Sequence, residues 1–391
     1  MAPSLKSHRT DRSRPASLST PQLSIDILLS ALSKSIFHPF IACLLPLCLR
    51  ALAAPYNSTS FILTSAFAAI VCLYHVLKIV DHRLGYGTPR HVDWSSEVVV
   101  ITGGLGGLGG CIAEIFGLRG VSVAVLDIAV PEQEHRNETD GIKFYHCDIS
   151  KSSDIEKVWK HISEDLGTPT ILINNAGINT HGSIAKFTTE QVEKIFQVNT
   201  LSQFCTTRLF LQGISFRENG GSIVTIASIL GHICAVGVAP YAASKAALSA
   251  YHTSLSAELR TRAPQIKTIL VAPGQLDTAL FKDMKLQGRM QKFVGPVVPV
   301  SELAVKIVRM IDDGEAGEIR EPFYARAFMG LPLLPMSVQR FLRWWGEVDS
   351  VLSSQIEEGY VGDGLDKSRA AKRNGTEGVY SDEEFSDDES D

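Results

Sequence analysis

The sequence lacks the cysteine spacing of a zinc site or of a disulfide-rich secreted protein. Its seven cysteines are scattered, odd in number, and no two of them are separated by two residues. Closely spaced pairs hold zinc, and even sets at regular spacing build disulfide frameworks. We therefore expect reduced thiols, no metal site and a folded domain that faces the cytosol.

A basic stripe with interleaved aromatic residues is also missing. The net charge is -5, but the last ten residues alone carry seven acids and no base, which leaves the rest of the chain at +2. A nearly neutral body does not attract the phosphates of a nucleic acid. We expect no nucleic-acid partner.

One long segment has no charge at all. No charged residue occurs between Arg50 and Lys78, and residues 61–77 are nearly all apolar. About 20 such residues cross a bilayer core. Residues 24–80 are therefore expected to form a membrane anchor with its main span at 61–80, the alternative being a buried helix. Basic residues flank this region on both sides, which favours a hairpin with both ends in the cytosol over a single span.

The remaining boundaries follow from composition. Residues 1–23 are polar and basic and are expected to be a disordered tail, as are the acidic residues 361–391. Residues 94–325 are expected to form the main folded domain, and 326–360 an apolar extension. Its core, 328–345, contains two prolines and ends in two tryptophans, so it suits the membrane interface, a lid over the substrate, or core packing.

Between residues 98 and 272, strand-like and helix-like segments alternate. The expected strands are 98–102, 121–127, 142–146, 170–174, 222–227 and 266–272; the expected helical stretches are 107–118, 154–166, 191–216 and 241–259. Such alternation indicates βαβ units. We predict an α/β fold: a Rossmann-type, doubly wound parallel sheet with helices on both faces.

A glycine-rich run, residues 102–109, follows the first strand directly. Glycine allows a sharp turn and a close approach of the backbone to a pyrophosphate, and the following helix offers free N–H groups. We expect this loop to bind a dinucleotide. The cofactor-binding candidates in it are Thr102, Gly103, Gly107, Leu108 and Gly109.

Asp127 ends the second strand, where a carboxylate can bind the ribose hydroxyls and would repel a 2′-phosphate. No basic residue lies in the glycine loop or follows Asp127 directly, so NAD is favoured over NADP. Asp148 and Ile149 end the third strand; Asp148 is expected to contact adenine or to cap the next helix. The small residues Ala176 and Gly177, after Asn175, leave room for the cofactor.

Tyr241 and Lys245 stand four residues apart on a predicted helix and therefore share a face. A nearby ammonium group favours the phenolate form of a tyrosine, which makes it a better acid/base catalyst. Ser228, at the end of the preceding strand, is placed to hold a substrate oxygen. Asn199 lies within a long predicted helix, where asparagine is unfavourable, which suggests that it holds a water beside Lys245.

In this order, the motifs resemble those of the short-chain dehydrogenase/reductase family. The run 102–109 is similar to its TGxxxGxG motif, 174–177 to its NNAG, and 241–245 to its YxxxK. The resemblance implies a catalytic set of Asn199, Ser228, Tyr241 and Lys245. It also implies cofactor contacts from Tyr241, Lys245 and the segment Pro273, Gly274 and Thr278. The anchor and the apolar extension narrow the likeness to the branch of membrane-bound retinol dehydrogenases and 17β-hydroxysteroid dehydrogenase type 11.

This branch implies NAD(P)-dependent interconversion of a lipophilic alcohol (a retinoid, a steroid or a long-chain lipid) and its carbonyl. Apolar residues after Ser228 (Ile229, Leu230, Ile233, Val236) and after the Pro273–Gly274 turn (Leu276, Leu280, Phe281, Met284) are expected to line the substrate pocket. Expected partners are a lipophilic substrate, the lipids of the endoplasmic reticulum or of lipid droplets, and a second copy in a homodimer. The alternatives are an NADPH-dependent keto-lipid reductase and a non-catalytic scaffold.

Overall fold

The computed structural model describes residues 24–130, 141–214, 219–278 and 295–346, together with Leu280, Phe293, Val348 and Asp349. Both expected disordered tails lie outside the described residues. So do Phe281 and Met284 of the expected substrate pocket.

Seven parallel strands form one sheet in the order β3-β2-β1-β4-β5-β6-β7. The strands are β1 (Val98–Thr102), β2 (Ser122–Asp127), β3 (Ile142–His146), β4 (Ile171–Asn174), β5 (Gly221–Ile226), β6 (Ile266–Val271) and β7 (Gly317–Ile319). The strand order reverses between β1 and β4, whose last residues Thr102 and Asn174 are paired. In such sheets the ligand lies beyond the carboxyl ends at this point. The predicted Rossmann-type fold is confirmed.

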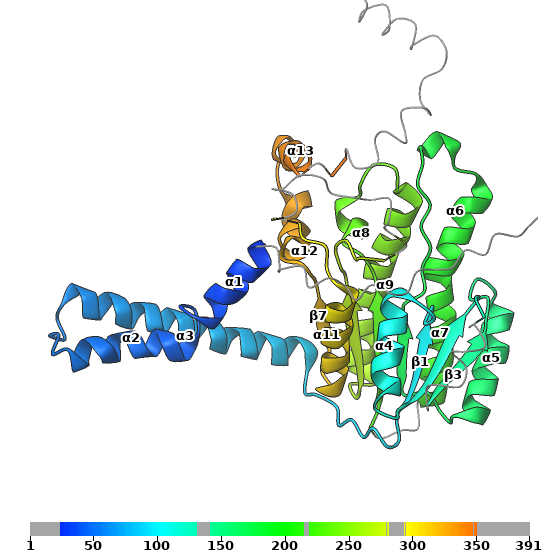
Figure 1. Ribbon diagram of the computed structural model, residues 1–391, viewed down its shortest axis with the longest axis horizontal. Helices are drawn as coiled ribbons and strands as arrows, with labels where there is room; N and C mark the ends of the chain where they lie inside the picture. The colour runs from blue at the N-terminus through cyan, green and yellow to red at the C-terminus, as the bar shows by residue number, and fades with distance from the viewer. Residues whose placement is uncertain are drawn as a thin grey trace, which may run out of the picture.

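Helices cover both faces of the sheet (Figure 1). Because successive side chains of a strand point to opposite faces, Val99 and Ile101 of β1 enter one core and Val100 enters the other. The first core includes α4 (Gly107–Gly117) and α11 (Val300–Asp312); the second includes α5 (Ser152–Asp165), α7 (Ser202–Ile214) and α9 (Ala239–Arg262). Burial on both faces explains the unbroken β-branched runs.

The structure departs from the expected elements in two places. Residues 191–216, expected as one helical stretch, form α6 (Thr189–Phe196), a π-helical turn η3 (Gln197–Leu201) and α7. Thr188 caps α6 in a reciprocal capping box with Gln191. The prediction also missed α11 and β7, since β7 is only three residues long and has no β-branched run.

The expected anchor region forms a helical hairpin, made of α2 (Pro39–Ala51) and α3 (Thr59–Tyr86), that projects from the domain (Figure 1). Ala42 of α2 packs against Ala68 and Val71 of α3. Within the described residues, α3 alone is a single helix long and apolar enough to cross a membrane, while α1 (Ile25–Lys34) and α2 form a pair bent by 52°. The far end of α3 is tied to the domain, because His82 Nε2 lies 3.3 Å from Glu315 Oε2.

The segment after β7 packs against the catalytic domain. It forms α12 (Phe323–Ala327), the 3-10 helix η5 (Phe328–Leu333) and α13 (Met336–Trp345), so the expected boundary at residue 325 falls inside a helix. Ala325 is buried against Ile229 and Ile233, which follow β5. Phe341 and Trp344 of α13 are exposed.

Candidate active site

The glycine loop turns sharply at the end of β1. Gly103 has φ +66°, and a Cβ there would lie 2.8 Å from the Cα of Ala176. A Cβ on Gly109 would lie 2.4 Å from the carbonyl oxygen of Gly103. Gly107 has φ +55° and begins α4. The loop therefore needs glycine both for its turn and for its close packing.

Two loops at the carboxyl edge are bonded to each other. The Thr102 hydroxyl accepts hydrogen bonds from the backbone N–H groups of Asn175 and Ala176, both at 3.1 Å. The Asn175 amide donates to the carbonyl of Gly103 at 2.8 Å. Thr102 does not itself line the cavity described next. It fixes the loop after β4 against the glycine loop.

A cavity of about 480 Å³ lies at this edge, where the strand order reverses. The predicted site residues that line it are Gly103, Gly107, Leu108, Asp127, Asp148, Ile149, Asn175, Ala176, Gly177, Ser228, Tyr241, Lys245, Pro273, Gly274 and Thr278. Thr102, Gly109 and Asn199 lie behind its wall. The structure thus brings together predicted residues from six strand ends and from α9.

The residues at the cavity suit a dinucleotide. A Cβ on Gly106, at the start of α4, would meet no atom within 4 Å, so the backbone is open to the cavity there. The first N–H groups of α4 offer partners for phosphate. The glycine loop can bind phosphate without a basic side chain, because the dipole of α4 already favours an anion at its N-terminus.

Asp127 holds the glycine loop from the side. Its carboxylate accepts hydrogen bonds from the N–H groups of Leu105 and Ala129, both at 3.1 Å. Each carboxylate oxygen can accept further bonds, so Asp127 can still bind ribose hydroxyls. Its charge lies on the cavity wall, as expected from the sequence.

Asp148 does not cap a helix. The first residue before α5 is Lys151, whose side chain makes no capping bond. Asp148 instead accepts from the Ser150 hydroxyl at 2.6 Å and lies 3.5 Å from Lys194 Nζ. The bond from Ser150, aided by the two neighbouring lysines, lowers the pKa of Asp148 to about 2. Asp148 is therefore charged at the cavity wall.

Tyr241, Ser228 and Lys245 converge on the inner end of the cavity. Tyr241 and Ser228 are joined by a side-chain hydrogen bond, and both are buried. The Lys245 ammonium donates to the carbonyl of Ile226 at 2.7 Å. It lies 5.8 Å from the centroid of the Tyr241 ring. A proton donor and a fixed cation thus share one buried site.

Burial dominates the titration of both groups. It raises the pKa of Tyr241 above its ordinary value, although the bond to Ser228 opposes that rise. It lowers the pKa of Lys245 to about 8. The expectation that Lys245 brings the pKa of Tyr241 below its usual value does not hold for the protein groups alone. At pH 7 the lysine is charged and the phenol is neutral.

Asn199 lies in the π-helical turn η3 rather than inside a regular helix. Its side-chain oxygen accepts from Ile178 N at 2.8 Å, and its amide donates to the carbonyl of Ile178 and the hydroxyl of Ser244, both at 3.0 Å. A Cβ built on Gly177 would be 3.5 Å from both Asn199 Oδ1 and Lys245 Nζ. Asn199 and Lys245 therefore flank Gly177 from behind the cavity.

The apolar residues expected around the substrate divide into two groups. Leu276 and Leu280 line the cavity. Ile229 and Ile233 instead pack in a buried cluster with Ala325. Leu230 packs at the edge of the first core. None of these three residues lines the cavity. Val236 is exposed and does not line it either. Ile229 and Ile233 therefore serve core packing, which was the alternative to a place in the substrate pocket.

Sequence reasoning missed Lys194, which lines the cavity from α6 and donates to the Ser150 hydroxyl at 2.6 Å. No motif marks it, because it reaches the site only through the position of α6, which brings it to Asp148 and Ser150 after β3. Tyr324 was also missed. Its hydroxyl accepts from Gln275 N at 3.1 Å and lies against Gly274, where a Cβ would be 2.0 Å away.

Comparisons with known proteins identify the chain. Residues 97–288 match the family model for short chain dehydrogenases. The uncharacterized oxidoreductase TDA5 of Saccharomyces cerevisiae is 32% identical over 274 residues, which cover 67% of this chain and 80% of the relative. The chain belongs to the short-chain dehydrogenase/reductase family. It is therefore an oxidoreductase, as the motifs predicted, of a family that uses NAD or NADP.

Two further relatives have more specific names. Retinol dehydrogenase 10-B of Danio rerio is 31% identical over 237 residues, 54% of this chain and 70% of the relative. Carbonyl reductase family member 4 of Xenopus laevis is 31% identical over 194 residues, 49% of this chain and 80% of the relative. The expected likeness to retinol dehydrogenases is confirmed.

A solved structure shares the fold. The structure titled 4-hydroxyisoleucine dehydrogenase complexed with NADH superposes with a TM-score of 0.52 at 23% identity, covering 57% of this chain and 96% of that one. At this identity the match supports the fold alone.

Proposed function

We propose that this enzyme interconverts a lipophilic alcohol and its carbonyl with NAD, using Tyr241 as the general acid/base. The observation that carries the proposal is the convergence of the Tyr241–Ser228 pair and the Lys245 ammonium on a cavity that also contains the glycine loop. Hydride, proton and substrate oxygen can then meet at one place.

Each catalytic side chain has one task in this proposal. The nicotinamide ring, when bound, accepts or gives the hydride. The Ser228 hydroxyl holds the substrate oxygen beside the Tyr241 phenol. Tyr241 takes the hydroxyl proton during oxidation and returns one during reduction. Because burial keeps its pKa high, its deprotonation needs positive charge nearby, which Lys245 and an oxidised nicotinamide ring together provide.

Behind these groups, Asn199 acts as a positioning residue. It fixes Ile178 and Ser244, which flank the loop after β4 and the helix that carries Lys245. A π-helical turn inside a helix commonly marks a functional site. We propose that the turn exists because it aims the Asn199 amide at these partners.

Asp127 favours NAD over NADP. Its carboxylate faces the part of the cavity that lies beyond β2, and an added 2′-phosphate would place a second negative charge beside it. Lys194, the cation nearest to that region in the cavity lining, is already engaged by Asp148 and Ser150. A preference for NADPH would support the keto-lipid reductase alternative.

The likeness to retinol dehydrogenases and the anchor hairpin support a lipophilic substrate. We propose that α3 crosses the membrane of the endoplasmic reticulum or inserts into the surface of a lipid droplet, with the sheet on the cytosolic side. The exposed Phe341 and Trp344 of α13 then suit the membrane interface. Such placement would raise the local concentration of a substrate that dissolves in the bilayer.

We also propose pairing of two copies through α7 and α9. Phe204 of α7 is 51% exposed and packs against Tyr251 of α9, with ring centroids 4.4 Å apart and the ring planes tilted by 49°. Light scattering of the purified enzyme in detergent tests this: a protein mass near one chain of 42.6 kDa would contradict it.

The function is tested with the full chain reconstituted in vesicles. Retinol, steroid alcohols and long-chain alcohols are supplied with NAD or NADP, and the corresponding carbonyls with the reduced forms. The proposal expects turnover of at least one lipophilic class with NAD favoured. Turnover of small polar alcohols only, or no binding of either dinucleotide, would overturn it.

A further inference from the structure

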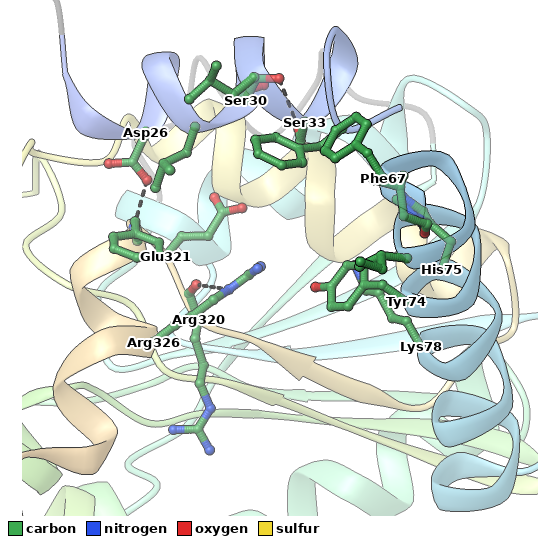
Figure 2. A pocket seen from close by; sticks show the side chains of 16 residues that line it. Asp26, Ser30, Ser33, Phe67, Tyr74, His75, Lys78, Arg320, Glu321 and Arg326 are labelled. Atoms are coloured by element: carbon green, nitrogen blue, oxygen red, sulfur yellow. Dashed lines mark hydrogen bonds between the residues drawn. The ribbon is translucent and has the colours of Figure 1, made fainter. Parts of the chain in front are cut away.

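A second cavity, of about 730 Å³, lies between the anchor and the catalytic domain. We call it the anchor cleft. Helices α1 and α3 form one side, and residues 320–326 form the other (Figure 2). Six of the twelve residues that line the anchor side are apolar: Leu29, Leu32, Phe37, Phe67, Ile70 and Val71. Such a wall suits an acyl chain.

The opposite side of the cleft is held in place by polar bonds. Asp26 of α1 accepts a hydrogen bond from Phe323 N at 2.6 Å, which ties α1 to the start of α12. Glu321 is paired with Lys306 at 2.5 Å, and Arg320 with Glu318 at 2.6 Å. The cleft is thus a built feature of the fold, and two of its charged residues, Arg320 and Glu321, are already paired. The second carboxylate oxygen of Asp26 is buried and has no hydrogen-bond partner among the described residues.

Two of the lining cations have no such partner. Among the residues that the structure describes, neither Lys78 nor Arg326 forms an ion pair with a carboxylate. Arg326 uses its Nε to donate to the carbonyl of Arg320 at 3.0 Å, which leaves the outer edge of its guanidinium group for another acceptor. Figure 2 shows the two residues on opposite sides of the cleft, Lys78 on α3 and Arg326 on the domain side. An anion between them would have two donors.

The position of Lys78 along α3 indicates where the cleft lies relative to the membrane surface. It is the first charged residue after the uncharged run that follows Arg50. If α3 crosses the bilayer as proposed above, Lys78 reaches the headgroup level at the cytosolic surface. Phe67, Ile70 and Val71 lie about two to three helical turns deeper, beside the acyl chains.

We propose that the anchor cleft binds one anionic phospholipid of the cytosolic leaflet. Lys78 and Arg326 hold its phosphate, and one acyl chain lies along the apolar wall of α1 and α3. Charge-assisted bonds to phosphate give the headgroup preference. The proposal rests on the membrane insertion of α3 but not on the catalytic chemistry.

The test uses the full chain in phosphatidylcholine vesicles that contain a minor share of phosphatidic acid with a photoactivatable group in its acyl chain. Mass spectrometry maps the labelled peptides. Labelling is expected in 29–37 or 67–71. The double variant Lys78→Gln/Arg326→Gln is expected to lose labelling about tenfold, since charged hydrogen bonds of this kind are each worth a kcal/mol or more. Arg326→Lys should retain most of it.

Matched controls separate the outcomes. Lys160→Gln removes a 77% exposed side-chain charge far along the chain on α5 and should leave labelling unchanged. Sedimentation with the vesicles and turnover with NAD should be the same for all variants, so loss of insertion or of activity is recognised separately. Equal labelling by the double variant would overturn the proposal. So would equal labelling by an uncharged retinoid photoprobe, or loss of lipid labelling in dilute inorganic phosphate.

Discussion

The ammonium nitrogen of Lys245 lies 5.8 Å from the centre of the Tyr241 ring, with both groups buried. The two residues are one helical turn apart on α9, so a single helix fixes their separation. Their pairing has an energetic cost, because burial disfavours a charged lysine. The predictions below follow from this arrangement and from the loops around it.

The first prediction concerns the pH dependence of stability. Lys245 has a folded pKa of about 8 against 10.5 in the unfolded chain, so the folded state pays for a buried charge at pH 7 and is relieved as pH rises past 8. Lys245→Met should therefore raise the melting temperature relative to wild type more at pH 7 than at pH 10. Scanning fluorimetry in detergent measures this. Lys160→Met, at an exposed site, is the control, and an equal shift at both pH values would contradict the assignment.

The second prediction concerns space for the cofactor. Gly106 has extended backbone, with φ -159°, and a Cβ there would meet no protein atom. Gly106→Ala should keep the melting temperature of the apo enzyme but weaken NAD binding by about tenfold, since a methyl group would occupy space beside the phosphate site. Calorimetry measures the affinity.

Gly330→Ala serves as its control, because Gly330 is equally open but lies far along the chain in η5. Unchanged NAD affinity in Gly106→Ala would show that the cofactor does not lie against the start of α4.

The third prediction concerns Asp127. Replacing it with serine removes the charge that would face a 2′-phosphate. The ratio of kcat/KM for NADP to that for NAD should rise by about a hundredfold, since juxtaposed like charges cost several kcal/mol. Asp154→Asn, in the first turn of α5, removes a charge outside the cavity and should not change the ratio. If Asp127→Ser leaves the ratio of kcat/KM for NADP to that for NAD unchanged, the adenosine ribose does not lie beside Asp127.

The fourth prediction tests the anchor hairpin. The sulfur atoms of Cys43 on α2 and Cys72 on α3 are 3.5 Å apart. A mild oxidant should therefore join them within one chain in membranes, which mass spectrometry detects as a linked pair of peptides. Cys43→Ser removes the link, and Cys48→Ser should not. Linkage only between separate chains would show that α2 and α3 do not fold back on each other.

The sequence was sufficient for the sheet and for most of the cavity. Strands β1, β4, β5 and β6 are buried along their whole length and rich in Val, Ile, Leu and Thr, whereas β3 is only partly buried. The glycine loop has a steric reason at every key position, so Gly103 and Gly109 could be placed by spacing alone. β7 could not, because three residues carry no periodicity.

Features that depend on packing were not accessible from the sequence. The π-helical turn at Asn199 inserts one residue without any break in the helical pattern. Asp148 was expected to cap a helix, but Ser150 and Lys194 hold it, and Lys194 comes from an element 44 residues later in the chain than Ser150. The anchor cleft likewise depends on α1 lying against α12, two segments at opposite ends of the chain.

The central claim is that the Tyr241 phenol moves the proton. Tyr241→Phe removes the hydroxyl while keeping the ring, so cofactor binding should persist and kcat should fall by about a thousandfold, within the usual range for general acid/base catalysis. Tyr251→Phe, on the same helix but outside the cavity, should keep its activity.

The most direct measurement is single-turnover transfer of deuterium from reduced, deuterium-labelled NAD to a lipophilic carbonyl substrate in vesicles. The wild-type enzyme and Tyr251→Phe should deliver the label to the substrate carbon, and Tyr241→Phe should bind the same cofactor but deliver almost none. Transfer by Tyr241→Phe at the wild-type rate would contradict the account.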